Sequence, residues 1–406
     1  MTDFNTMDNF DFSGKTVIAR LDLNSPMDPQ TGEFLDTRRI EKHAITVKEL
    51  SEKGAKVVVL SHQGRPGSRD FTTLNSHTEY LQKEVGIPIE YIEGGLISPG
   101  VVRKIKEMKD GEIILLENVR FLSEENISQP ADVQAKTHFV GTLAPLADIY
   151  VGDAFATAHR SQSSLVGFPE ILPSCAGRVM ERELSMLSEA RNSDARPSVF
   201  SAGGAKVRDS LKVIAHFLDR GVVDTILTSG LVASVFLVAK GYTIDGLEYM
   251  ENYDSLVRKA KALYNDYSDK ILLPEDLAAD KYGKRLEIPL SELPIPYKIS
   301  DIGSKTAEKY SEILRSAKTI IANGPAGIFE DENFAKGTNE IAKAIAESGG
   351  FTVVGGGHIA TAIRKLNLGD KITHISTGGG ACILFLAGEK LPAIEALKKA
   401  KEREAK

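Results

Sequence analysis

FTVVGGGHIATAI, at residues 351–363, is the stretch that identifies the fold class. It begins as a short apolar strand, continues through three glycines and a histidine, and ends in what reads as the first turns of a helix. A strand that runs through glycines into a helix is the repeating unit of parallel α/β folds. The stretch therefore predicts a parallel sheet covered by helices, and it raises the question of what the glycine loop holds.

The same alternation occupies most of the chain. Short β-branched runs, separated by segments of helical length, lie at 16–20, 56–60, 112–116, 197–202, 224–229, 318–323, 351–356 and 373–377. Such spacing indicates βαβ units and parallel strands. We therefore expect an α/β protein with two doubly wound parallel-sheet (Rossmann-like) domains joined by a hinge helix.

A break at residues 167–190 suggests where the two domains meet, because it carries two prolines and then a long amphipathic helix pattern. A chain of 406 residues exceeds what one hydrophobic core usually organises, so two domains of about 100 to 250 residues are expected. We expect an amino-terminal domain at 1–172, a hinge helix at 173–190 and a carboxy-terminal domain at 191–390. A charged terminal helix is expected at 391–406.

Composition limits the function classes. Apolar residues make up 42% and charged residues 26% of the chain, as in ordinary soluble globular proteins. A net charge of −6 argues against nucleic-acid binding. The sequence contains no run of 18 apolar residues, so it does not suggest a membrane span. The acidic start lacks the order of a signal peptide, so we expect a cytoplasmic protein. Cys175 and Cys382 are expected to be buried free thiols. We also expect the chain to act as a monomer, with a dimer as the alternative.

The first half carries arginine and histidine after its strands, in the segments RLDLN (20–24), DTRRI (36–40), SHQGRP (61–66), LLENVRF (115–121) and DAFATAHR (153–160). Ligands of parallel sheets bind beyond the carboxyl ends of the strands, where these side chains would converge. Guanidinium groups suit carboxylate and phosphate oxygens. Any single arginine is more simply a surface ion pair, but five such clusters together predict a small, highly anionic substrate.

The second half repeats strands that run into glycines opening a helix, as in FSAGGAKVRDS, LTSGLVAS, VVGGGHIATA and ISTGGGACIL. Glycine lets backbone N–H groups approach an anion, and a helix amino terminus adds partial positive charge. Each such end contributes about 0.3 to 2 kcal/mol, whereas a micromolar ligand needs about 8 kcal/mol. One loop would be only a tight connection, and several acting together predict a nucleotide site.

Two alternatives stay open from the residues alone. Gly355, Gly357 and Ala360 satisfy the G-x-G-x-x-A pattern of dinucleotide-dependent oxidoreductases, although the next strand ends in Ser376 and Thr377 instead of an acidic residue. A non-catalytic nucleotide-binding protein would need the glycine loops and would not need the arginines of the other half.

Taken in order, the motifs resemble those of the phosphoglycerate kinase family. The segments that carry the resemblance are RLDLNSPMD, VLSHQGRP, LLENVRF, YVGDAFATAHRSQSS, GGAKVRDS, ILLPEDLAAD, DIGSKT, NGPAGIFE, VGGGHIAT and STGGGA, and they span residues 17 to about 398. The resemblance implies a two-domain hinge enzyme that transfers a phosphoryl group between 1,3-bisphosphoglycerate and ADP, with Mg²⁺, giving 3-phosphoglycerate and ATP. Two details below resemble the archaeal branch.

The resemblance also implies roles for individual residues. Arg39 would neutralise charge on the phosphoryl group in flight, Lys206 would reach the nucleotide phosphates, and Gly356 and Gly379 would act with them in catalysis. The implied substrate-binding residues are Asp22, Leu23, Asn24, Arg39, His62, Gln63, Gly64, Arg65, Arg120 and Arg160. The implied nucleotide-binding residues are Gly203, Gly204, Lys206, Gly230, Asn323, Pro325, Gly327, Glu330, Gly355, Gly356, Gly357, His358 and Ile359. A phosphate is implied at the helix start formed by Thr377, Gly378, Gly379 and Gly380.

Two positions depart from the family pattern. A second lysine often stands four residues after the first, but this chain has Ser210, and Lys212 would point away from Lys206 on a helix. Many members have Asp-Thr after the three glycines, where the aspartate helps to hold Mg²⁺; this chain has His358 and Ile359. Imidazole is a poor magnesium ligand, so the metal ligands are left unassigned. His358 is expected either to donate a hydrogen bond to a phosphate or to be merely exposed or capping.

Overall fold

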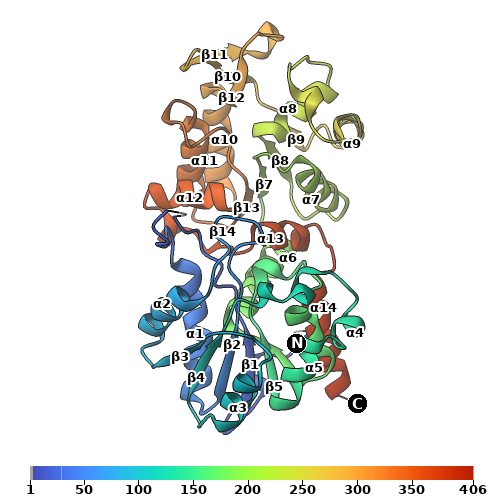
Figure 1. The fold of residues 1–406 in the computed structure, drawn as a ribbon. Coiled ribbons are helices and arrows are strands. Elements are labelled where there is room, and N and C mark those ends of the chain that lie inside the picture. Colours follow the sequence, from blue (N-terminus) through green and yellow to red (C-terminus); the bar gives the residue numbers. More distant parts are fainter. Residues whose placement is uncertain (1–2, 29, 406) are drawn as a thin grey trace. The chain divides into compact units, whose positions relative to one another are not determined.

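The computed structural model describes residues 3–28 and 30–405. Contacts divide the chain into two compact units. One holds the residues up to Leu184 together with the segment from Lys390 onward, and the other is Ser185–Glu389. In Figure 1 each unit has a sheet with helices packed around it.

The first unit is built on a sheet of six parallel strands in the order β3-β4-β2-β1-β5-β6. The strands are β1 (Thr16–Arg20), β2 (Lys56–Leu60), β3 (Ile89–Ile92), β4 (Ile113–Leu116), β5 (Ile149–Gly152) and β6 (Ser174–Ala176). Its helices are α1 (Arg38–Glu52), α2 (Asn75–Val85), α3 (Pro99–Glu107), α4 (Ala131–Gln134), α5 (His138–Leu143) and α14 (Pro392–Glu404). The central strands β1 and β4 are buried at every position, as expected for a sheet covered on both faces.

The second unit repeats this plan with a sheet in the order β15-β14-β13-β7-β8-β9, again all parallel. Its strands are β7 (Ser198–Ala202), β8 (Thr225–Thr228), β9 (Ile271–Leu272), β13 (Thr319–Asn323), β14 (Phe351–Gly355) and β15 (His374–Ile375). Its helices are α7 (Val207–Asp219), α8 (Gly230–Ala239), α9 (Tyr253–Asp266), α10 (Ser304–Ser316), α11 (Lys336–Glu347), α12 (Gly357–Lys365) and α13 (Gly379–Leu386). The prediction of two parallel-sheet α/β domains is confirmed.

The second unit also contains a sheet that was not expected from the sequence. A three-stranded antiparallel sheet in the order β11-β10-β12 is formed by β10 (Asp276–Lys281), β11 (Lys284–Pro289) and β12 (Lys298–Ile302). The β10–β11 turn contains Gly283, whose left-handed φ of 80° suits a tight hairpin. Its strands lack the long apolar runs of the parallel sheets. They bury only a few side chains, Leu277, Ala279 and Ile288, in a small core with Leu237.

Helix α6 (Arg178–Asn192) runs from one unit into the other. Its start is held by Asp153, whose carboxylate accepts the backbone N–H groups of Val179 (2.9 Å) and Met180 (3.0 Å). The same carboxylate is 2.8 Å from His43 Nδ1. A carboxylate at a helix amino terminus satisfies donors that have no partner within the helix, so Asp153 fixes where α6 begins.

The charged terminal helix packs on the first unit. Its apolar face, formed by Leu391, Ile394 and Leu397, is buried, while Arg403 donates to the carbonyls of residues 169, 170 and 172. Both cysteines are buried and free, as expected. Within residues 3–28 and 30–405, no helix combines the length and the apolar character that a membrane span requires.

Candidate active site

The first unit gathers three arginines around one cavity. Arg65, Arg120 and Arg160, with Pro66 and Asn126, line a space of about 430 Å³. They come from the segments that follow β2, β4 and β5. These three strands belong to one parallel sheet, so their carboxyl ends lie at the same edge and bring the arginines together. The structure thus places three of the expected substrate residues in one concave surface.

The cavity has uncompensated positive charge. Burial, together with the nearby charges of Arg160 and Arg20, lowers the pKa of Arg120 to about 10 against the opposing effect of Glu125. Burial and the charge of Arg65 likewise lower the pKa of Arg160. Positive charges held close together destabilise one another, and a bound anion between them relieves this repulsion. The arrangement therefore suits a phosphate or carboxylate.

Arg39 lies on the first turn of α1 and is oriented by Asp22. Its Nη1 donates to Asp22 Oδ2 at 2.7 Å and to the carbonyl oxygen of Asn24 at 3.1 Å. Burial alone would raise the pKa of the Asp22 carboxyl, but the charges of Arg39 and the neighbouring basic groups outweigh it and lower that pKa to about 2. Asp22 is therefore an ionised buried carboxylate that fixes an arginine. The Arg39 side chain keeps 34% of its surface exposed, enough to meet a ligand.

His62 is buried and neutral. Its Nδ1 accepts an N–H from Arg20 Nη2 at 3.2 Å, since a guanidinium can only donate. Burial, with the charges of Arg20, Arg120 and Arg160, holds the pKa of His62 well below its ordinary value, although Asp22 opposes this. Its proton consequently lies on Nε2, and the ring can donate one hydrogen bond without adding charge.

Other expected substrate residues support the loops. The Leu23 side chain is buried in the core. Gln63 is buried and bonds to the backbone of Ser25 through both its Oε1 and its Nε2, each at 3.0 Å. Gly64 has a φ of 66°, and its amide donates to Asn24 Oδ1 at 2.9 Å. A contact of Leu23 or Gln63 with substrate would therefore have to use the backbone.

Two residues outside the expected set support this site. Arg20 is 1% exposed and donates to Ser164 Oγ at 2.7 Å, and its Nη2 lies 3.8 Å from Glu125 Oε1. Glu125 also accepts from Ser163 Oγ at 2.8 Å. The position of Arg20 at a strand end was a sequence signal for the cluster, whereas nothing in the sequence distinguishes Glu125 from a surface glutamate.

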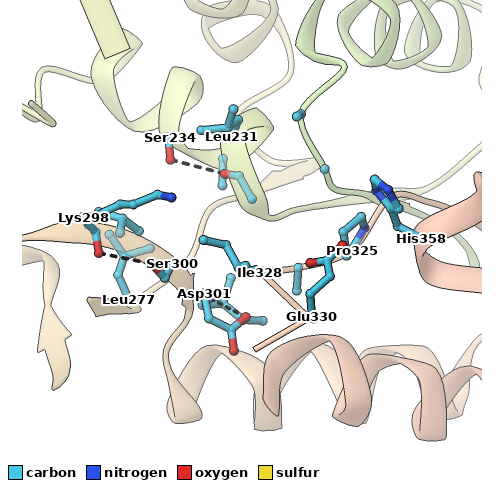
Figure 2. A pocket seen from close by; sticks show the side chains of 18 residues that line it. Leu231, Ser234, Leu277, Lys298, Ser300, Asp301, Pro325, Ile328, Glu330 and His358 are labelled. Atoms are coloured by element: carbon cyan, nitrogen blue, oxygen red, sulfur yellow. Dashed lines mark hydrogen bonds between the residues drawn. The ribbon is translucent and has the colours of Figure 1, made fainter. Parts of the chain in front are cut away.

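The second unit has a narrow cavity of about 270 Å³. Six expected nucleotide residues line it: Gly204, Gly230, Pro325, Gly327, Glu330 and His358. Figure 2 shows Glu330 and His358 at one end, and Lys298, Ser234 and Leu231 at the other. Lining residues that sequence reasoning missed include Leu231, Ser234, Leu277, Lys298, Ser300 and Asp301, which come from α8 and the antiparallel sheet.

Three glycine amides are not available to an anion. Gly203 and Gly204 donate to the carbonyls of Asn323 and Pro325, both at 2.8 Å, and Gly230 donates to the carbonyl of Ala326 at 3.0 Å. A nucleotide contact by these three glycines would therefore have to use atoms other than their amide N–H groups. A side chain would not fit at these positions, because the backbone of another loop packs against them. A Cβ on Gly203, for example, would lie 2.5 Å from the Pro325 carbonyl oxygen. The β7 and β13 loops are thereby joined into one cavity wall.

The starts of α12 and α13 are different. Helix α12 begins at Gly357 and α13 at Gly379, and the first amides of a helix have no acceptor within it. A Cβ on Gly379 would lie 3.6 Å from the Gly356 Cα, so the two starts face each other closely. Gly356 has a φ of 90°, and a Cβ there would lie 3.0 Å from Asn323 Oδ1. Two helix amino termini thus converge beside a buried amide, an arrangement suited to phosphate oxygens.

The remaining expected residues are placed around these starts. Gly355 ends β14, Thr377 and Gly378 precede α13, and Gly380 is its second residue. The Gly378 amide donates to Ser376 Oγ at 3.2 Å. Ile359 is 1% exposed and packs in the core of the unit, so its side chain faces away from any ligand.

Lys206 is exposed immediately before α7, while Ser210, one turn further, is 1% exposed. The Ser210 hydroxyl has no hydrogen-bond partner among the described residues. Lys212 Nζ lies 2.8 Å from Glu389 Oε1. Lys212 is therefore engaged elsewhere and does not replace the second lysine.

Across the described ranges, no three His, Cys, Asp or Glu residues group as a metal site would require. Of the carboxylates that line the cavity, Asp301 accepts from Arg285 Nη1 at 2.9 Å and from the Gly337 amide at 2.8 Å. Burial raises the pKa of Asp301 to about 6 despite these donors. Glu330 is exposed, and His358 lies with its ring centroid 5.7 Å from that of Phe329.

Comparisons with known proteins agree with this geometry. Residues 7–389 match the family model described as Phosphoglycerate kinase. The chain is 48% identical over 410 residues to the phosphoglycerate kinase of Methanothermus fervidus, covering 100% of both chains. It is 45% identical to that of Archaeoglobus fulgidus, over 97% of this chain and 96% of that one.

Solved structures give the same result. The crystal structure of phosphoglycerate kinase from Pyrococcus horikoshii is similar with a TM-score of 0.90 and 45% identity, over 98% of this chain and 100% of that one. The structure of phosphoglycerate kinase from Coxiella burnetii is similar with a TM-score of 0.83 and 33% identity, over 98% and 99% of the two chains. The likeness extends over both units.

Proposed function

The chain belongs to the phosphoglycerate kinase family, and from this premise we propose which residues carry each part of its reaction. It is a phosphotransferase that moves a phosphoryl group between 1,3-bisphosphoglycerate and ADP, giving 3-phosphoglycerate and ATP. The oxidoreductase and the non-catalytic alternatives are set aside, because the family match covers residues 7–389, including both the arginine cluster and the glycine loops.

The substrate phosphate binds in the arginine cavity. Arg65, Arg120 and Arg160 supply guanidinium donors whose mutual repulsion an anion relieves. This cavity is the single observation that supports the assignment most strongly, because a dinucleotide enzyme has no need of it. Asp22, Asn24 and His62 would then orient the glycerate portion, with His62 donating from Nε2.

The transfer step needs charge stabilisation more than covalent chemistry. The bond between the acyl oxygen and phosphorus breaks while a terminal β-phosphate oxygen of ADP forms a bond to the same phosphorus, and the carboxylate leaves with the electron pair. Arg39, held by Asp22, would neutralise charge on the phosphoryl group, and the amides at the starts of α12 and α13 would donate to its oxygens. No general base is required, since ADP is already an anion.

The nucleotide would occupy the cavity of the second unit, with Lys206 and His358 at its phosphates and Glu330 at the ribose. Bound Mg²⁺ would offset phosphate charge, and we propose that nucleotide oxygens and water hold it, since the cavity lacks a free carboxylate pair. His358 would donate a hydrogen bond to a phosphate. Because Ser210 stands where the family often has a second lysine, Arg39 and Lys206 would carry a larger share of the stabilisation of transition-state charge.

The two ligands are assigned to different units, so transfer requires that the units bring them together. We propose that α6 acts as the hinge, and that closure with both substrates bound excludes water from the acyl phosphate. Because the two units of one chain carry every assigned residue, we propose that a monomer is active. Light scattering at assay concentrations tests this, and activity confined to a dimer would contradict it.

The activity is tested by measuring ATP formation from ADP and 1,3-bisphosphoglycerate with the purified protein. We expect turnover that depends on both substrates and on Mg²⁺. ATP formation that persists without the acyl phosphate, or reduction of a nicotinamide cofactor by the protein alone, would contradict the assignment. Nucleotide binding without any turnover would support a binding protein instead.

A further inference from the structure

The far end of the nucleotide cavity carries a charge that the reaction does not use. Lys298, the first residue of β12, is exposed and lines the cavity at the end opposite Glu330 and His358 (Figure 2). Since the phosphates are assigned to the His358 end, this far end receives the base. Lys298 is thus the charged residue nearest the base end, and it was not singled out from the sequence.

The surroundings leave the Lys298 ammonium free to contact a ligand. Its neighbour across the antiparallel pair is Asp280, but no ion pair within 4.0 Å joins Lys298 to any described carboxylate. Asp280 instead accepts the Gly283 amide at 2.7 Å, within the hairpin turn. In Figure 2 the Lys298 side chain extends toward Ser234 and into the cavity.

The rest of the base end is a slot for a flat ring with acceptors at its edge. Leu231, Leu277 and Ile328 line the slot with apolar side chains. Two hydroxyl groups complete it, and each already donates: Ser234 to the Gly230 carbonyl at 3.3 Å and Ser300 to the Lys298 carbonyl at 3.4 Å. Their lone pairs remain to accept, while Lys298 supplies donors.

We propose that Lys298 is a specificity-determining residue that lets this enzyme use 6-oxopurine nucleotides such as GDP as well as ADP. A lysine has donors only, and it matches O6 and N7 of guanine, two acceptors on one edge. Adenine presents an amino group at position 6, which a lysine cannot pair with, and contributes only a ring nitrogen. The hydroxyl acceptors of Ser234 and Ser300 suit the amino group of adenine or the N1–H of guanine.

This inference rests on the proposed nucleotide site, and one set of assays separates the two. Initial rates of nucleoside triphosphate formation from 1,3-bisphosphoglycerate are measured with ADP, GDP and IDP for the wild type, Lys298→Met and Lys298→Gln. Lys284→Met, an exposed lysine of the same antiparallel sheet outside the cavity, is the control.

We expect the wild type to use GDP with a kcat/KM within about tenfold of that for ADP. Lys298→Met should lower kcat/KM for GDP and IDP by at least about fivefold more than it lowers kcat/KM for ADP, the lower range for one base-edge contact. Lys298→Gln, which adds an acceptor, should favour ADP further. Equal losses for IDP and GDP attribute the effect to O6.

Two results would overturn the inference. One is a wild type that discriminates against GDP by more than about a hundredfold; the other is a Lys298→Met variant whose kcat/KM falls equally for ADP and GDP. Failure of every nucleotide in the wild type would instead remove the proposed function itself.

Discussion

Arg39 Nη1 lies 2.7 Å from Asp22 Oδ2, and this pair joins the first helix to the loop after the first strand of the amino-terminal sheet. Asp22 is 1% exposed, whereas Arg39 retains a third of its surface. The buried Asp22 carboxylate therefore fixes the arginine, while part of the Arg39 side chain stays exposed. A charge-stabilising arginine works only when it is held in place before the reaction.

Replacing Arg39 with alanine should lower kcat by about three orders of magnitude or more, the range for an arginine that stabilises transferred phosphoryl charge. Steady-state rates with ADP and 1,3-bisphosphoglycerate measure this. Arg38→Ala is a matched control, because Arg38 Nε lies 2.7 Å from Asp36 and belongs to a surface pair. A variant of Arg39 that keeps more than a tenth of wild-type turnover would contradict the role.

Asp22 should make stability depend on acid pH. Its folded pKa of about 2 is below the ordinary value of 3.8, so its ionised form stabilises the fold above pH 3.8, and this contribution is lost as the pH falls toward 2. The full contribution is about 2 kcal/mol. Urea unfolding of wild type and Asp22→Asn should show a stability difference that shrinks by about 1 kcal/mol between pH 5 and pH 3.

The exposed Asp132→Asn variant is the control for that experiment and should show a much smaller change. A difference between wild type and Asp22→Asn that stays constant down to pH 3 would rule out a depressed pKa at Asp22.

The arginine cavity predicts a salt-sensitive substrate affinity. Arg65→Ala should raise the KM for 3-phosphoglycerate about tenfold, because one charged hydrogen-bond donor is lost. It should also flatten the rise of KM with ionic strength, since fewer charges are screened. Arg69→Ala, an exposed arginine of the same loop that does not line the cavity, should change KM little. Equal effects of both substitutions would indicate a general field instead of a specific site.

The facing helix starts predict a selective effect of Gly379→Ala. The added methyl would lie 3.6 Å from the Gly356 Cα, an ordinary contact, so the fold should tolerate it. It would occupy space between the two helix amino termini, and we expect kcat to fall about ten- to a hundredfold as amide contacts are lost. Gly369→Ala, which meets nothing within 4 Å, is the control. Thermal melting checks the fold, and unchanged turnover of Gly379→Ala would contradict the assignment.

His358→Ala should weaken MgADP binding about fivefold if the imidazole donates to a phosphate. Calorimetric titrations at pH 6 and pH 8 measure the affinity, with the exposed His138 of the first unit replaced by alanine as the control. Unchanged affinity at both pH values would leave His358 as an exposed residue of the first turn of α12.

Much of the fold could be inferred from local patterns. The strands at 16–20 and 56–60 were expected with the same bounds that the structure gives them, because continuous apolar runs with β-branched residues have few other conformations available. The short strands β3, β6 and β9 and the antiparallel sheet were not expected, since their few residues carry little periodic signal. The arginines of the cavity could be anticipated from their places after strands, because parallel strands end at one edge of a sheet.

Contacts between residues distant in sequence account for the rest. The amides of Gly203, Gly204 and Gly230 looked equivalent to those of the later loops, yet backbone from the β13 loop takes them up. Lys298 lies just before the DIGSKT segment, outside every motif that the sequence offered, and it reaches the cavity in the strand β12, which pairs with β10. A sequence pattern records what each segment favours locally, whereas which donors are already paired depends on what packs against them.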